Sequence, residues 1–255
     1  MAWWGTLIGG ALGFMFGGVL GALLGAALGS NFDKGLKLND SFAPGDQERV
    51  QAAFFTACFS VMGHVAKADG RVTQDEIESA RQIMARMQLN KAQKDAAIKL
   101  FNEGKRAGFP LVDVLEQFRK ECHRRRNLMQ MFLEIQLATA MADGVLHAEE
   151  KLIIHRIADT LGFSSHEIEH LINMATGSRH QRQDTGMTLD DAYAMLDVSR
   201  SATDAKVKKA YRRLMSQHHP DKLVSKGLPE EMIKLATEKT QEIRKAYEKI
   251  QASRQ

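Results

Sequence analysis

The chain has 255 residues, which is enough for one large or two modest domains together with a membrane segment. Its two cysteines, Cys58 and Cys122, lie far apart without a C-x-x-C spacing. This pattern suggests neither a disulfide framework nor a cysteine zinc site, and it indicates reduced, cytoplasmic thiols. The formal net charge is +4, but residues 188–255 alone hold fourteen Lys and Arg against ten Asp and Glu. That segment carries the whole excess, so the charge needs a local explanation and does not by itself indicate nucleic acid.

The N-terminal segment is apolar and uncharged as far as Asn31. As a helix, residues 3–29 would be about 40 Å long, against roughly 30 Å of bilayer hydrocarbon, which predicts a transmembrane anchor over residues 1–31. A secretory signal would need a basic start and a shorter apolar stretch, and the sequence has neither. Lys34 and Lys37 follow the span, which favours a periplasmic N-terminus and cytoplasmic C-terminal domains.

Glycine recurs at every fourth position of this span. The set is Gly5, Gly9, Gly13, Gly17, Gly21, Gly25 and Gly29. Positions four apart lie close together on a helix, so these glycines would form a groove in which a second backbone can approach closely. We expect a homodimer through this helix; the alternative is an ordinary Gly-rich span without a partner.

Residues 32–47 read as a linker, and residues 48–175 show helical periodicity without strand alternation. We expect seven helices in this central domain, at 48–68, 74–87, 91–104, 111–125, 127–142, 148–161 and 165–175. Thr73 with Glu76 and Ser164 with Glu167 have the spacing of capping boxes. Pro110 is placed to open another helix.

The central domain contains a short internal repeat. Residues 66–70 (AKADG) and 140–144 (AMADG) are each followed by an apolar residue and an acidic pair. This repetition indicates a pseudo-symmetric helical bundle. The segment resembles the TerB-like family of all-helical domains, which carries such A-x-A-D-G turns.

The acidic residues of the two turns allow two interpretations. Asp69, Glu76, Asp143 and Glu150 could together bind a divalent cation, as in a metal-responsive sensor. No EF-hand spacing is present, so we favour turns in which glycine ends one helix and the acidic residues stabilise the start of the next. We therefore predict no metal site and no cofactor. The run His123–Arg126 could bind phosphate, but it also suits a helix C-terminus, which we favour.

After a second linker at 176–187, residues 188–255 form the last predicted unit. Thr188 can cap a short helix to Leu196, and Thr203 can cap a longer one to His218. Pro220 disfavours helix at the residue before it, so the second helix should end at His219-Pro220-Asp221. A polar loop follows, and a third helix is expected over 230–251. Two antiparallel helices joined by an exposed loop result.

This unit closely resembles the J domain of the DnaJ family. The resemblance lies in residues 192–196 (AYAML), 208–214 (KKAYRRL), the tripeptide and residues 243–247 (IRKAY). It implies that the second helix binds the acidic surface of a DnaK-type (Hsp70) chaperone and that His219, Pro220 and Asp221 couple docking to ATP hydrolysis. The basic residues that would meet this acidic surface are Lys206, Lys208, Lys209, Arg212 and Arg213.

The whole chain is therefore expected to be all-α, with a transmembrane helix, a TerB-like bundle and a C-terminal J domain. This order resembles the DjlA family of bacterial inner-membrane co-chaperones. The resemblance implies a regulator of DnaK, not an enzyme, whose central domain selects an unknown client or signalling partner near the membrane. A nucleic-acid-binding protein remains an alternative, because the basic helix could contact phosphates instead.

Overall fold

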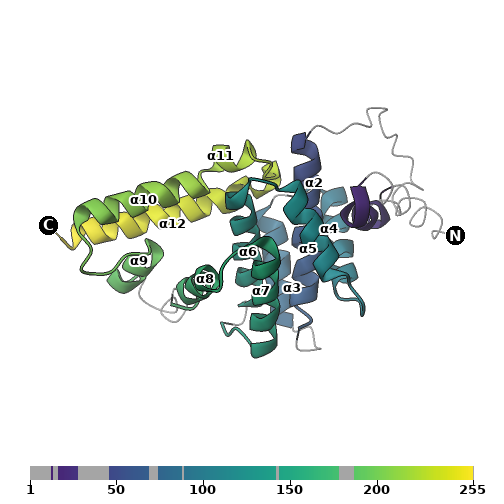
Figure 1. The fold of residues 1–255 in the computed structure, drawn as a ribbon, viewed down its shortest axis with the longest axis horizontal. Coiled ribbons are helices and arrows are strands. Elements are labelled where there is room, and N and C mark those ends of the chain that lie inside the picture. The colour runs from purple at the N-terminus through teal and green to yellow at the C-terminus, as the bar shows by residue number, and fades with distance from the viewer. Residues whose placement is uncertain are drawn as a thin grey trace.

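The computed structural model describes residues 13, 17–27, 46–68, 74–87, 89–141, 144–177 and 187–254. These residues form helices, turns and loops and contain no strand, as the all-α prediction requires. Figure 1 shows a helical bundle, α2 to α8, beside an elongated unit made of α9, α10 and α12. Helix α11 lies where the two parts meet.

The bundle contains seven helices, at positions close to those predicted. They are α2 (Asp46–Val65), α3 (Gln74–Arg86), α4 (Lys91–Gly104), α5 (Leu111–Glu121), α6 (Arg126–Ala140), α7 (Ala148–Leu161) and α8 (Ser165–Gly177). The predicted cap of α8 is confirmed: the Ser164 N–H donates to Glu167 Oε2 at 2.8 Å, and the Glu167 N–H donates to Ser164 Oγ at 3.3 Å. The predicted cap at Thr73 and Glu76 lies outside the described residues.

Aromatic side chains and close helix contacts hold the bundle together. Phe54, Phe118 and Phe132 bring α2, α5 and α6 together, with ring centroids 4.6 to 6.2 Å apart. Where α2 crosses α4, a Cβ added at Gly63 or Gly104 would overlap a carbonyl oxygen of the other helix. Glycine is therefore needed at both positions, because only a hydrogen atom fits between the two backbones.

The elongated unit consists of α9 (Leu189–Met195), α10 (Asp204–His218), α11 (Pro220–Val224), a 3-10 turn η1 (Glu230–Met232) and α12 (Ile233–Ala252). The predicted caps are confirmed, since the side chains of Thr188 and Thr203 accept from the N–H groups of Asp191 and Lys206. Tyr211 of α10 stacks on Tyr247 of α12 with ring centroids 4.2 Å apart. The predicted polar loop after the tripeptide is wrong for residues 220–224, which form α11 directly from Pro220.

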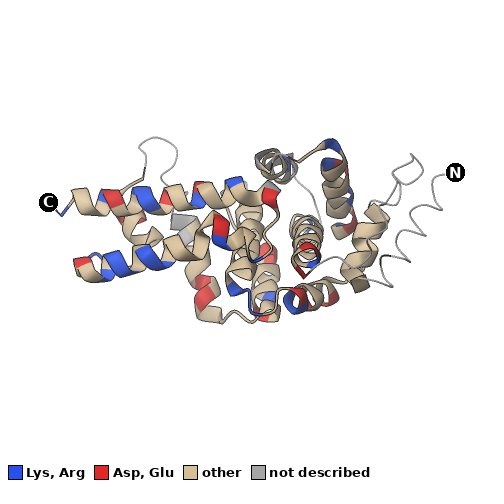
Figure 2. Cartoon of the chain, turned by 90° about the horizontal axis from the view of Figure 1, so that it is seen from above, with Lys and Arg blue, Asp and Glu red and all other residues tan. Residues whose placement is uncertain are grey.

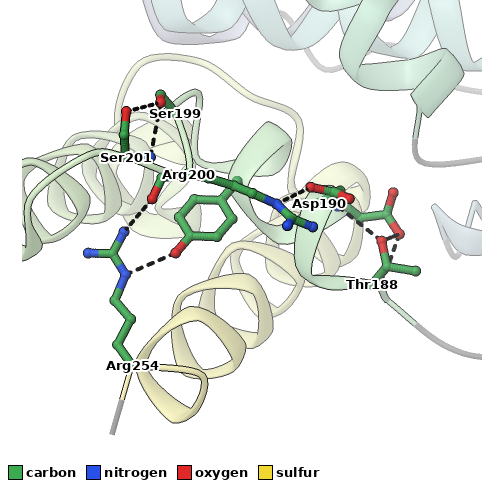
Figure 3. Close-up of polar contacts among 8 residues, drawn as sticks. Thr188, Asp190, Ser199, Arg200, Ser201 and Arg254 are labelled. Atoms are coloured by element: carbon green, nitrogen blue, oxygen red, sulfur yellow. Dashed lines mark hydrogen bonds and ion pairs between the residues drawn. The ribbon is translucent and has the colours of Figure 1, made fainter.

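Polar contacts close the far end of this unit. Arg254, just after α12, donates to the Tyr193 hydroxyl at 2.9 Å and to the carbonyl oxygen of Arg200 at 3.4 Å (Figure 3). The Arg200 side chain in turn pairs with Asp190 at 2.5 Å. These contacts tie the end of α12 to α9 and to the turn before α10, so this end of the helical hairpin is fixed.

Residues 17–27 are helical and lie against α4 and α5 (Figure 1). The Leu20 N–H donates to Gln117 Oε1 at 2.9 Å, and Lys99 Nζ donates to the Ala27 carbonyl at 2.9 Å. Within the described ranges, none of the helices combines the length and the apolar character that a bilayer crossing demands.

Candidate functional site

The exposed face of α10 collects all five basic residues singled out from the sequence. Val207, Ala210, Leu214 and His218 are buried, so this stripe of the helix faces inward. Lys206, Lys208, Lys209, Arg212 and Arg213 are all exposed. Figure 2 shows the resulting row of basic residues along α10, whereas α12 beside it carries both signs of charge. The basic face can therefore meet an acidic surface without rearrangement.

One of these residues is already paired within the chain. Arg213 Nη2 lies 3.3 Å from Asp197 Oδ2, while Asp197 Oδ1 lies 3.3 Å from His170 Nε2 of α8. Asp197 has a φ of 56°, which is uncommon for a residue other than glycine. The carboxylate thus joins the basic face to the helical bundle, a link that the sequence did not indicate.

The tripeptide lies at the end of α10 and is open to solvent. His219 ends α10 in an extended conformation, and Pro220 occupies the first turn of α11. Its fixed φ suits that position, which explains why the chain resumes a helix immediately. His219 and Asp221 are exposed, and within the described part of the chain their side chains form no hydrogen bond or ion pair. Both are therefore available to a second molecule.

The residue before the tripeptide has the opposite environment. The side chain of His218 is buried, and its Nε2 lies 3.7 Å from Glu134 Oε1 of α6. Burial lowers the pKa of His218; Glu134 opposes this effect and Lys239 adds to it. His218 is consequently neutral near pH 7, and it packs against the bundle instead of facing solvent.

Comparison with known proteins decides the family. The chain matches models of the DnaJ domain at residues 191–255, of tellurite resistance protein TerB at 55–173 and of the co-chaperone DjlA transmembrane domain at 1–39. It is 43% identical to the co-chaperone protein DjlA of Yersinia pestis, with 98% of both chains covered. The chain belongs to the DjlA family of co-chaperones.

Other members of the DjlA family are equally similar. The Vibrio cholerae protein is 44% identical over 96% of both chains, and the Coxiella burnetii protein is 43% identical over 100% of this chain and 99% of its own. No solved structure matches the chain. The three family models follow one another in the order expected from the sequence, so anchor, TerB-like domain and J domain are all assigned.

The acidic turns of the TerB-like domain are described only in part. Gly144 has a φ of 97°, in the left-handed region expected of a glycine that ends a turn. Glu150 is buried, and its Oε2 accepts from the His147 N–H at 2.9 Å at the start of α7. Asp69, Asp143 and the side chain of Glu76 lie outside the described residues, and the remainder contains no group of three potential metal ligands. Glu150 thus acts as a helix cap.

The basic run between α5 and α6 differs from the interpretation given to it. We assigned it to a helix C-terminus, but only His123 and Arg124 follow α5, and Arg126 opens α6. Arg126 pairs with Glu167 of α8 at 2.6 Å and lies over the Phe163 ring at 4.5 Å. Arg126 therefore fastens two helices of the bundle together and does not complement a helix dipole.

The N-terminal glycines are described in part. Gly5, Gly9 and Gly29 lie outside the described residues. The backbones of Gly13 and Gly21 approach so closely that a Cβ on either would overlap the carbonyl oxygen of the other, whereas a Cβ at Gly17 would meet no atom within 4 Å. Among the described residues, the space for a Cβ at Gly17 is therefore open, while the Gly17 carbonyl oxygen accepts from Gln117 Nε2 of α5.

Proposed function

We propose that this protein binds DnaK, an Hsp70-type chaperone, through α10 and stimulates its ATPase through His219, Pro220 and Asp221. The observation that carries the proposal is the exposed tripeptide at the end of an exposed basic helix. Long-range attraction between this helix and an acidic surface speeds encounter, and the tripeptide can then reach the chaperone. Hydrolysis takes place on DnaK, so the protein acts as a regulator and not as an enzyme.

The nucleic-acid alternative predicts a different dependence on the tripeptide. Phosphate contacts would use α10 and would be indifferent to the single negative charge of Asp221. Asp221 is exposed and has no ion-pair partner among the residues that the structure describes, which supports a role in protein recognition.

Binding of ATP-loaded DnaK to the full chain in lipid nanodiscs tests this proposal. We expect saturable binding that weakens with salt, and loss of ATPase stimulation in Asp221→Asn. Asp204→Asn is the matched control, because Asp204 is an exposed carboxylate at the start of α10, far from the tripeptide, where it pairs with Arg254. Binding to duplex DNA that is as tight as binding to DnaK, and unaffected by Asp221→Asn, would favour the alternative.

We further propose how the protein lies in the cell. The match to the DjlA transmembrane domain and the lysines after the apolar stretch support a single-pass inner-membrane anchor, a periplasmic N-terminus and cytoplasmic C-terminal domains. The glycine spacing supports a homodimer through the anchor. In this arrangement the TerB-like domain selects a client or signalling partner close to the membrane, and the J domain brings DnaK to it.

A further inference from the structure

Apolar residues that follow the tripeptide belong to the buried core of the TerB-like domain. Leu223, Leu228, Met232 and Ala236 are all 0% exposed. They belong to the same buried cluster as Phe54 and Leu128 of the bundle. The hairpin has a separate core farther along, around Leu196, Val207 and Ile243. The loop that follows the tripeptide therefore has its apolar contacts with the bundle.

Backbone contacts support the same junction. Gly227 has a φ of 96°, and a Cβ at this position would lie 2.6 Å from Val50 Cγ1 of α2. Only glycine combines this left-handed conformation with so close an approach. The loop thus lies directly on the first turns of α2.

Polar side chains of the bundle reach the two segments that flank the tripeptide. Asn127 Nδ2 of α6 donates to the Gln217 carbonyl at 3.4 Å, in the last turn of α10. Gln47 Nε2 of α2 donates to the Val224 carbonyl at 3.3 Å, at the end of α11. Glu134 approaches His218 from α6. Each contact comes from the TerB-like domain, yet His219 and Asp221 stay exposed.

We infer that α2 and α6 of the TerB-like domain position the tripeptide, so that this domain contributes to stimulation of the DnaK ATPase. The inference rests on the proposed function and adds Gln47, Asn127 and Glu134 as positioning residues. A loop held in one conformation loses less entropy when a partner docks, and a displaced trigger group loses much of its effect. The J domain is therefore expected to act best while it is attached to the bundle.

Point variants of the full chain in nanodiscs test the positioning role. The variants are the pair Gln47→Ala with Asn127→Ala, and Glu134→Gln. The control is Glu103→Gln at the end of α4, which pairs with Arg106 in the turn that follows this helix. In single-turnover hydrolysis by DnaK, maximal stimulation should fall about threefold or more. The concentration of this protein that gives half-maximal stimulation of DnaK should change little, because the variants leave the basic face of α10 unchanged. Variants with unchanged helicity and unchanged maximal stimulation would overturn the inference.

A crosslink tests whether the contact between α2 and the segment after the tripeptide stays in place while DnaK is stimulated or must break first. Gln47→Cys and Ser225→Cys place thiols on α2 and beside Val224, and a short bismaleimide can join them. Cys58 and Cys122 are buried, so they do not compete for the reagent. Because Gln47→Cys itself removes a positioning contact, the reference is the same double variant before crosslinking. Stimulation that is equal or higher after crosslinking supports the inference, whereas stimulation that disappears on crosslinking overturns it. If the unmodified chain itself fails to stimulate DnaK, it is the proposed function that is wrong, whatever the crosslink does.

Discussion

At the residue scale, burial controls the chemistry of the two cysteines. Cys58 and Cys122 are both inaccessible to solvent. Burial raises the pKa of each thiol to about 12, although a hydrogen bond from Gln136 lowers that of Cys58 and Arg125 lowers that of Cys122. The thiolate is the nucleophile, so neither residue should react at neutral pH.

This gives a prediction for alkylation. In the folded protein at pH 8, we expect iodoacetamide to leave Cys58 and Cys122 unmodified for hours, as followed by mass spectrometry. Both should react promptly in guanidinium chloride, which is the control. Rapid modification of Cys122 in the folded protein would show that the end of α5 opens readily, contrary to the packing described above.

At the level of single residues, the sequence predicts those interactions whose partners lie a few positions apart in the chain. The caps at Ser164, Thr188 and Thr203 were found because each involves a contact only three residues away. Asp197 was missed because its partners, His170 and Arg213, come from two other helices. No local pattern identifies such a carboxylate.

At the element scale, Glu167 stabilises the start of α8. Its pKa is lowered to about 2, first by the Ser164 N–H and then by the side chains of Arg126 and Ser164. A lowered pKa stabilises the folded state above the usual carboxyl pKa, and this contribution is lost as the pH falls from about 4.5 toward 2. The group is nearly half exposed, so solvent screening reduces its contribution.

We therefore expect Glu167→Gln to lower the free energy of unfolding at pH 7 by about 0.5 kcal/mol. Urea unfolding followed by circular dichroism measures it, and the difference from the unmodified protein should vanish near pH 2. Glu116→Gln, an exposed carboxylate of α5, is the control and should have no effect at either pH. If Glu167→Gln lowers the free energy of unfolding equally at both pH values, the charge of Glu167 does not contribute to stability.

The basic face of α10 should govern affinity and not the maximal rate. Replacing Lys208 and Lys209 with Gln removes two exposed charges without touching the tripeptide. We expect the half-saturating concentration for DnaK to rise about tenfold at low salt, and the effect to fade near 0.5 M salt, where the screening length is only about 4 Å. The pair Lys91→Gln and Lys94→Gln on α4 is the control. A lower maximal stimulation with unchanged half-saturation would contradict this assignment.

Helix positions in the bundle could be predicted because an apolar stripe with turn residues at its ends is a local signal. α11 could not be predicted in the same way. Pro220 was interpreted as a helix breaker, but it both ends α10 and provides the first turn of α11. Leu223 and Leu228 in the supposedly polar loop were the available sign that this segment packs against something.

At the scale of the whole molecule, the glycine spacing predicts an interface between two copies. Gly17 is the best position to test, because a Cβ added there meets none of the described atoms within 4 Å. Gly17→Leu should weaken energy transfer between labelled copies in lipid vesicles at least about threefold. Ala26→Leu, nine residues or about two and a half turns further along, places a leucine on the opposite face of the helix and should have little effect. If energy transfer is equal in the unmodified protein and in both variants, the proposed dimer interface is wrong.

The order of the domains could be predicted from the sequence, but their packing could not. Each domain has local motifs, whereas the junction depends on contacts between Gln47 and Val224 and between Asn127 and Gln217, which lie 177 and 90 residues apart. Such contacts leave no periodic trace in one sequence. The structure was needed to place the tripeptide on the bundle.

The rate of a single turnover of ATP hydrolysis by DnaK tests the account most directly. The full chain in nanodiscs should raise this rate at least about tenfold, and His219→Gln should abolish the increase while helicity and membrane insertion are retained. His123→Gln, an exposed histidine outside the tripeptide, should stimulate like the unmodified protein. If His219→Gln stimulates as well as the unmodified chain, the tripeptide is not the trigger and the proposed function is wrong.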